Sequence, residues 1–377
     1  MRHLSSTTRF LLLALVALGI FGFTLTSRQP HPPPPTPFDR AQMLAHLAYH
    51  VMLPTYLEFE DAANALQHAT SQLCDAPTMP QLETTQARWR QAAMVWKRSE
   101  AFQLGLTQTY AQSIGFWPAR PRRLRLALTS AQPITPAFVE TMGAAAHGLS
   151  AIEYLLFDAE AGQTAVLQAM QTGPMAKQWC PYLVAMATHL ADKAQAVAQL
   201  WRPEGGDFSG TVARAGHGAT TYPTSHQAIS DIVNHLVSAV EAVLNHKIGK
   251  PLRGNGQKPW PHAVEAGRSG TSTTLMLATL EGALAVYSGK TASAEGPGFE
   301  AFLAALGSDL APRITRQFDA ALTAVRAIPA PLRVAVVEQP QTVQAAYQAV
   351  HQLLILLKVD MTNVLSVTVD FSDNDGD

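Results

Sequence analysis

Apolar residues recur three and four positions apart through most of the chain, which is the spacing of one helix face. The clearest stripe, in residues 223–247, consists of Ile229, Ile232, Val233, Leu236, Val240, Val243 and Leu244. Residues 340–361 repeat the pattern behind Pro340. Similar runs, rich in alanine, cover about 40–72, 79–104, 176–201, 263–287 and 297–328. Helices of this kind predict an all-α fold.

Two stretches depart from the helical pattern. Val367, Val369 and Phe371 alternate with polar residues near the end of the chain, which allows one strand at most. Residues 203–222 combine Gly, Ser and Thr without any period. We therefore predict a linker at 203–222 between two helical bundles, at 38–202 and 223–377.

The first 27 residues have the character of an export signal. Arg2 and Arg9 precede an apolar run from Phe10 to Leu25. The run is short for a bilayer span of about 20 residues, and Leu25 interrupts the small residues expected before a cleavage site. Cleavage and retention as an inner-membrane anchor both stay open. Residues 28–37 form a proline-rich linker, and either outcome predicts a periplasmic protein.

Composition narrows the function classes. Of the 377 residues 47% are hydrophobic and 15% are charged, against roughly 25% charged in an average soluble protein, so the chain can bury a large core. The 27 basic and 28 acidic residues leave a net charge of −1, and we expect no nucleic-acid partner. Two cysteines exclude a multi-cysteine zinc site. In an oxidising compartment Cys74 and Cys180 are predicted to form a disulfide, and two buried free thiols are the alternative.

Several segments, in the right order, resemble the imelysin family of exported bacterial proteins, which includes an insulin-cleaving metallopeptidase and iron-uptake proteins. They are VMLPTYLEFEDAANAL (51–66), RWRQAAMVWKRSEAFQLG (88–105), IGFWPARPRRL (114–124), HGLSAIEYLLFD (147–158), HKIGKPL (246–252), VEAGRSGTS (264–272) and VLSVTVDFSDNDGD (364–377). The resemblance spans most of the mature chain. It implies two helical bundles related by duplication of a four-helix unit.

The resemblance also directs attention to Glu153. The peptidase and iron-binding branches carry a His-x-x-Glu motif here, whose two side chains share one helix face and can share a metal. This chain has Ser150 in the histidine position, and His147 lies six residues before Glu153. On a regular helix those two side chains diverge by about 120°. They converge only if Gly148 lets His147 precede the helix. A helix-start carboxylate stabilised by the macrodipole is the plainer interpretation of Glu153.

A second candidate cluster follows Pro261. His262 and Glu265 form a His-x-x-Glu pair in the expected first turn of a helix and give a weak metal-site prediction. Arg268 stands three residues after Glu265, so a helical ion pair is the plainer interpretation. Ser269 lies in the same family-like segment. We expect Glu153, Glu265 and Arg268, with both glutamates near helix starts, to meet between the two halves of the chain.

Three weaker candidates complete the set. His46 and His50 have metal-ligand spacing, but Leu47 occupies the position of the zincin glutamate, and surface or core histidines are the plainer interpretation. The terminal Asp373–Asp377 run offers oxygen ligands without the spacing of an EF-hand. Trp117, set in the loop sequence FWP, is a candidate pocket wall.

These observations predict a periplasmic imelysin-like binding protein associated with acquisition of iron, haem or another metal. Its polar site would lie at the interface of two bundles. The iron link and the partners, other envelope iron-uptake proteins, come from the resemblance. Iron or another divalent cation is the expected cofactor type, and the sequence does not identify it. A metallopeptidase of the same family is the alternative, although Ser150 removes its main support. A structural partner in an envelope complex is the second alternative.

Overall fold

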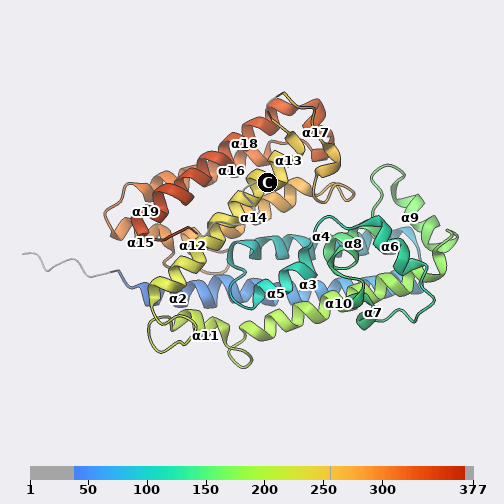
Figure 1. Ribbon diagram of the computed structural model, residues 1–377, viewed down its shortest axis with the longest axis horizontal. Coiled ribbons are helices and arrows are strands. Elements are labelled where there is room, and N and C mark those ends of the chain that lie inside the picture. The colour runs from blue at the N-terminus through green and yellow to red at the C-terminus, as the bar shows by residue number, and fades with distance from the viewer. Residues whose placement is uncertain (1–37, 255, 370–377) are drawn as a thin grey trace, which may run out of the picture. The chain divides into compact units, whose positions relative to one another are not determined.

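The computed structural model describes residues 38–254 and 256–369, and from Asp39 onward these form one compact unit (Figure 1). This part of the chain is helical, and its one β-type pairing is an isolated bridge between Lys290 and Glu295. The predicted signal or anchor, the proline-rich linker and the acidic tail lie outside the described residues. None of the helices within the described ranges has both the length and the apolar content needed to cross a bilayer.

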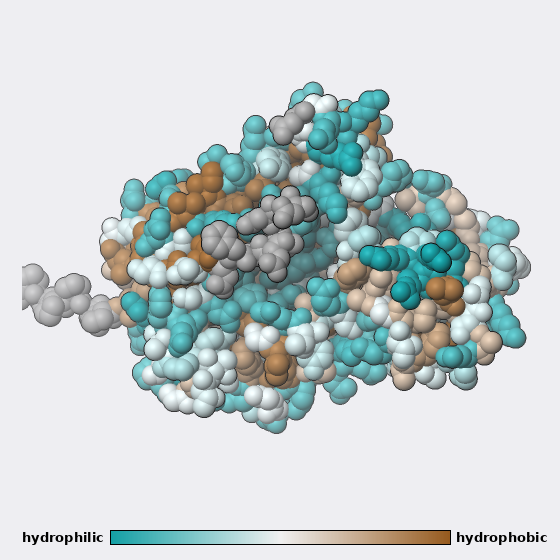
Figure 2. Space-filling model, viewed as in Figure 1, coloured by the Kyte–Doolittle hydropathy of each residue, from teal (hydrophilic) through white to brown (hydrophobic). Residues whose placement is uncertain are grey.

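The first group of helices contains three long members. They are α3 (Leu53–Asp75), α4 (Met79–Ser99) and α10 (Ala176–Trp201). The shorter members are α2 (Arg40–His46), α5 (Thr107–Gly115), α6 (Pro121–Leu128), α7 (Pro136–Thr141), α8 (Gly148–Leu156), α9 (Gly162–Gln171) and α11 (Phe208–Ala213). Helix α3 packs against α4 and α10, and α8 packs against the same two helices. The core of this group is aromatic, with Trp89, Trp96 and Trp201 at most 2% exposed. The face of the molecule shown in Figure 2, in contrast, is mostly hydrophilic or neutral.

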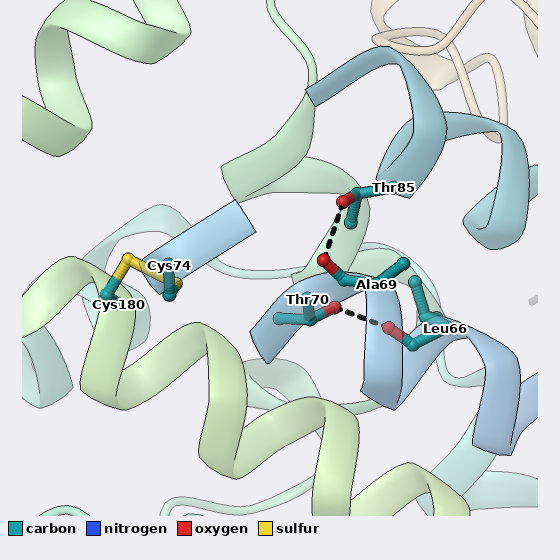
Figure 3. The surroundings of a disulfide bond; sticks show 6 residues. All are labelled: Leu66, Ala69, Thr70, Cys74, Thr85 and Cys180. Carbon is teal, nitrogen blue, oxygen red and sulfur yellow. Dashed lines mark hydrogen bonds between the residues drawn. A yellow bond between two sulfur atoms is a disulfide. The ribbon is translucent and has the colours of Figure 1, made fainter. Parts of the chain in front are cut away.

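Cys74, near the end of α3, forms a disulfide with Cys180 on α10, as the sequence predicted (Figure 3). The bond joins residues that are 106 positions apart. It restricts the conformations of that loop in the unfolded chain and thereby stabilises the folded state. Two hydroxyl groups support the neighbouring turns. Thr70 donates to the carbonyl oxygen of Leu66 at 2.7 Å, within α3. Thr85 donates to the carbonyl oxygen of Ala69 at 3.1 Å, so α4 is tied to α3 beside the disulfide.

The second group is built on α12 (Ser225–Ala242), α14 (Ser272–Ser288), α16 (Leu310–Arg326) and α18 (Pro340–Ile355). Each of these packs against two of the others, so the four close into a bundle. Shorter helices connect them: α13 (Lys250–Leu252), α15 (Phe299–Ala305), α17 (Leu332–Glu338) and α19 (Thr362–Leu365). Thr224 and Gln227 form a capping box that fixes the start of α12.

The two groups meet where α14 lies against α4. A side chain at Gly282 of α14 would come within 2.0 Å of the carbonyl oxygen of Arg98, so the close approach needs glycine. The 3-10 turn η2 (Glu100–Phe102) continues α4 and contacts both α12 and α14. The stretch 203–222 contains α11, whose Phe208 ring lies 5.0 Å from that of Trp201. The two-domain division at that stretch stays a prediction.

Two local expectations need correction. The run 297–328 is two helices, because the chain turns between α15 and α16, where Gly307 has φ +71°. No helix spans 263–271, and α14 begins only at Ser272, because Ala266 and Gly270 adopt positive φ. Residues 367–369 form no strand, which is compatible with the expectation of one strand at most. Several long helices also contain a π-helical turn that apolar spacing does not reveal, for example Leu47–Met52 and Val243–Gly249 (η4).

Candidate functional site

A cleft of about 530 Å³, here called the main cleft, is lined by residues from both groups of helices. Trp117 and its following prolines form one wall, and Ser150, Glu153 and Tyr154 of α8 form another. The segment from Pro261 to Arg268 and Arg333 of α17 complete it. Its size falls within the range of small-ligand pockets. A second hollow of about 420 Å³ lies next to it and includes Lys247, Lys250 and Glu265.

Trp117 lines the main cleft, the second hollow and a small cavity of about 20 Å³. Its loop is held in place because the Ser150 hydroxyl donates to the Phe116 carbonyl oxygen at 2.6 Å. The Lys250 ammonium lies 5.9 Å from the centre of the indole ring, within cation–π range. The structure therefore places Trp117 as a pocket wall, and the motif serine serves as its support.

Helix α8 positions Glu153. It begins at Gly148, whose φ is +74° and whose missing side chain would lie 2.6 Å from the Ile114 carbonyl oxygen. Glu153 is the sixth residue of this nine-residue helix, so the expected place in the first turn of a long helix is wrong. Its side chain is buried, and one carboxylate oxygen accepts the Ser269 backbone N–H at 2.8 Å.

The pKa of Glu153 lies above its ordinary value. Burial is the largest cause and outweighs the lowering effects of the Ser269 hydrogen bonds and the Arg268 charge, while the Glu265 charge raises the pKa further. A carboxyl group of this kind, in a cleft wall and without a directly paired cation, can carry a proton or accept a hydrogen bond from a ligand.

Glu265 occupies a loop, because Pro261–Ala263 is a single 3-10 turn and the predicted helix does not follow it. Its carboxylate contacts the Lys97 ammonium at 2.6 Å and the Lys247 ammonium at 3.6 Å. Glu100 contacts the same two lysines, at 2.6 and 2.5 Å. These four side chains form an alternating arrangement, which we call the charge ring.

The two lysines of the charge ring are buried, its two glutamates are partly buried, and the ring is neutral as a whole. Burial alone raises the pKa of Glu265, but the Lys97 and Lys247 charges outweigh it and leave the pKa below its ordinary value. The pKa of Glu100 is lowered for the same reason, with Lys247 contributing more than Lys97. Both carboxyl groups are therefore ionised at neutral pH. The ring joins α4, η2, η4 and the 264–271 loop.

Arg268 does not form the expected ion pair with Glu265. Its Nε donates to the Phe157 carbonyl oxygen at 2.8 Å, and its Nη2 contacts the Asp158 carboxylate at 3.1 Å. The guanidinium also covers the Tyr154 ring at 4.4 Å. The Glu265–Arg268 ion pair is absent because residues 264–271 are not helical, so the two side chains do not have the i, i+3 geometry of a helix.

Glu153 and Glu265 come from different halves of the chain and line the same small cavity, together with Lys97 and Trp117. Arg268 joins Glu153 in the main cleft. The structure thus brings the three predicted residues to one region, with Ser269 supplying its backbone N–H. Glu265 faces the lysines, whereas Arg268 faces Asp158.

The candidate histidines are separated. His147 does precede α8, but its Nδ1 lies 3.2 Å from the Ser113 carbonyl oxygen and its ring lies 4.7 Å from that of His189. His262 lines the main cleft, where Glu265 does not. His46 stacks on His50 and hydrogen-bonds the Gly289 carbonyl oxygen. In the described ranges no three His, Cys, Asp or Glu side chains are grouped to hold a metal ion.

Sequence reasoning missed the lysines Lys97 and Lys247 and the arginine Arg333. Lys97 and Glu100 stand three residues apart at the end of a helix, which could have indicated an ion pair. Nothing in the sequence indicates that Lys247, about 150 positions later, completes the ring. Arg333 is the second residue of α17, and no sequence motif marks it. Only the tertiary structure brings it to the cleft.

Comparison with known proteins agrees with this fold. The imelysin family model matches residues 52–357. Iron-regulated protein A of Synechococcus elongatus is 28% identical over 287 residues, which are 75% of this chain and 74% of that protein.

Two solved structures share the fold. One, assigned as an iron-regulated protein A precursor from Parabacteroides distasonis, has a TM-score of 0.76 at 19% identity and covers 88% of this chain and 95% of its own. An imelysin-like protein from Psychrobacter arcticum has a TM-score of 0.69 at 18% identity, with 88% and 97% covered. With most of its length matched by the family model, this chain belongs to the imelysin family.

Proposed function

We propose that this chain is an exported, periplasmic binding protein of iron acquisition that holds a small iron-associated ligand in the main cleft. The name of the relative from Synechococcus elongatus, which is 28% identical, supports the link to iron. The apolar run Phe10–Leu25 supports export. Other envelope proteins of iron uptake are the partners that this role implies.

The observation that carries the proposal is the role of Ser150. In the position where a His-x-x-Glu motif needs a metal-binding imidazole, this chain has a hydroxyl, and that hydroxyl donates to the Phe116 carbonyl oxygen. It supports the Trp117 wall. Glu153 meanwhile accepts a backbone N–H. The cleft therefore has the parts of a binding site, a fixed aromatic wall and oriented polar groups, whereas the peptidase motif lacks its histidine.

Metal analysis of the purified protein, with and without iron in the medium, tests the proposal. We expect iron to copurify in iron-replete preparations and to be lost from Trp117→Ala, because the indole forms a wall of the cleft. Trp260→Ala is the matched control, since Trp260 is 39% exposed and is not among the residues that line the main cleft. Absence of iron from every preparation would contradict the proposal.

A protease assay separates this role from the peptidase alternative. We expect no cleavage of a generic protein substrate by the wild-type chain. Cleavage that a chelator stops, and that Glu153→Gln abolishes, would replace the binding role by a peptidase role.

A further inference from the structure

A cluster of arginines borders the main cleft and has no acidic partner among the residues that the structure describes. Arg120 and, on α6, Arg122, Arg123 and Arg125 are all exposed. Within the described residues none of the four side chains forms an ion pair or a hydrogen bond, in contrast to Arg98 and Arg202, which contact Glu58 and Glu60. We call the four residues the arginine surface. Figure 2 shows strongly hydrophilic residues gathered where Figure 1 places α6.

The arginine surface is hollowed and lies directly beside the cleft. Arg120, Arg122, Arg123 and Leu126 line a hollow of about 440 Å³. The neighbours of Arg120 in the chain, Ala119 and Pro121, line the main cleft. A ligand that approaches the cleft along this segment therefore passes the unpaired guanidinium groups.

The lining of the cleft contains two further arginines, Arg268 and Arg333, together with the acidic residues Glu153, Asp158 and Glu160. Arg268 is paired with Asp158, but Arg333 has no acidic partner within 38–254 and 256–369: its Nη2 donates to the Ala159 carbonyl oxygen at 2.9 Å. The Arg333 Nε is buried and has no hydrogen-bond partner in the described part of the chain. A buried N–H without an acceptor costs free energy, and an oxygen atom of a ligand would satisfy it.

We propose that the main cleft takes a small, oxygen-rich anion of the polycarboxylate class, alone or as its iron complex, with the arginine surface as its entrance and Arg333 as a donor within the cleft. This rests on the proposed function and specifies its ligand. Guanidinium groups suit the task because their planar N–H pairs match the geometry of carboxylates. The chain as a whole has a net charge of −1, so the attraction comes from this local cluster.

The charge preference of the cleft can be tested on protein purified after expression of the full chain. The protein is titrated with citrate, ferric citrate and spermidine. We expect binding of the two anions and none of the trivalent cation. Binding of spermidine in preference to citrate would overturn the proposal. A vesicle arm, with phosphatidylglycerol or phosphatidylcholine, examines the other anionic partner; retention on phosphatidylglycerol without citrate binding would also overturn it.

Two variants with the same change in charge test the entrance. Arg122→Gln/Arg123→Gln should slow ferric citrate association about tenfold at low salt, with the difference shrinking in 0.5 M salt as charges are screened. Arg88→Gln/Arg316→Gln changes exposed arginines on α4 and α16 and should leave the rate unchanged. Equal rates for the two double variants would overturn the role of the arginine surface.

Arg333→Gln tests the inner donor. It keeps an amide N–H but loses the charged fork, and we expect affinity for ferric citrate to fall about tenfold, mainly through faster dissociation. Unchanged affinity would overturn the assignment of Arg333. If iron copurifies with the protein but neither citrate nor ferric citrate binds, the proposed function stands and the ligand class is wrong. If no iron copurifies and no anion binds, both are wrong.

Discussion

Two carboxylates that line one small cavity have opposite electrostatic settings. Glu153 is held by a backbone N–H, and burial raises its pKa. Glu265 is partly buried, which also raises its pKa, but two lysines outweigh this effect and lower the pKa. Burial disfavours the ionised form of both carboxyl groups. The pKa values differ because two lysines compensate this effect at Glu265, whereas no directly paired cation does so at Glu153.

The contrast separates a structural cluster from a candidate binding group. Each carboxylate of the charge ring has ammonium partners. The ring therefore holds α4, η2 and η4 together without leaving an unpaired charge. Glu153 has no direct cationic partner, and its ionised form is disfavoured where it lies. Buried ionisable groups with a shifted pKa and no compensating partner occur preferentially at functional sites. We infer that the ring maintains the cleft and that Glu153 serves the ligand.

Breaking the charge ring should have the largest effect. Glu265→Gln leaves Lys97 and Lys247 with one shared carboxylate, and we expect a loss of about 3 kcal/mol in unfolding free energy. Urea denaturation at pH 7 measures it. The double variant Lys97→Met/Glu265→Leu, which retains the Lys247–Glu100 pair, should be less destabilised than Glu265→Gln alone. A larger loss in the double variant would show that the ring is not an electrostatic unit.

The pH dependence of stability should differ between the two carboxylate settings. Glu100 and Glu265 have lowered pKa values, so they stabilise the fold above the ordinary glutamate value of 4.5, and this contribution is lost as the pH falls below it. Glu153 has a raised pKa, so its contribution is present at low pH and lost as the pH rises above 4.5. Denaturation of the wild type, Glu153→Gln and Glu265→Gln from pH 2 to pH 7 measures these slopes. Parallel curves for Glu153→Gln and Glu265→Gln would contradict the assignment.

Removing the support of the Trp117 loop should cost less. Ser150→Ala deletes one hydroxyl-to-carbonyl hydrogen bond, worth about 1 kcal/mol. Ser288→Ala deletes a similar bond, to the Leu284 carbonyl oxygen, far along the chain in α14. Both should lower the denaturation midpoint by similar amounts, and only Ser150→Ala should weaken ligand binding. Equal ligand affinity in the two variants would remove the supporting role of Ser150.

The smallest effect on stability should come from Glu153→Gln. The amide oxygen can still accept the Ser269 N–H, and the variant removes a charge that burial disfavours, so stability at pH 7 should be unchanged or slightly higher. A loss of stability comparable to that of Glu265→Gln would place Glu153 among the structural carboxylates.

The sequence predicted the fold class well and the site in part. The three-four spacing of apolar residues determined the long helices, and the family-like segments directed attention to Glu153, Glu265 and Arg268. The helix expected at 263–271 was wrong because backbone conformations at Ala266 and Gly270 override propensity there. Ser150 and Trp117 were candidates, but their link through the Phe116 carbonyl oxygen became visible only in the structure.

What the sequence by itself determined is therefore local: helix faces, the disulfide that its two cysteines allow, and the absence of a histidine three residues before Glu153. Tertiary structure alone decided which charges meet. Lys97 and Lys247 reach Glu265 from distant elements, and Arg268 contacts Asp158 in place of its sequence neighbour. The physical reason is that helix periodicity depends on residues a few positions apart, whereas the pKa of a buried carboxylate depends on whatever the fold places within a few ångströms of it.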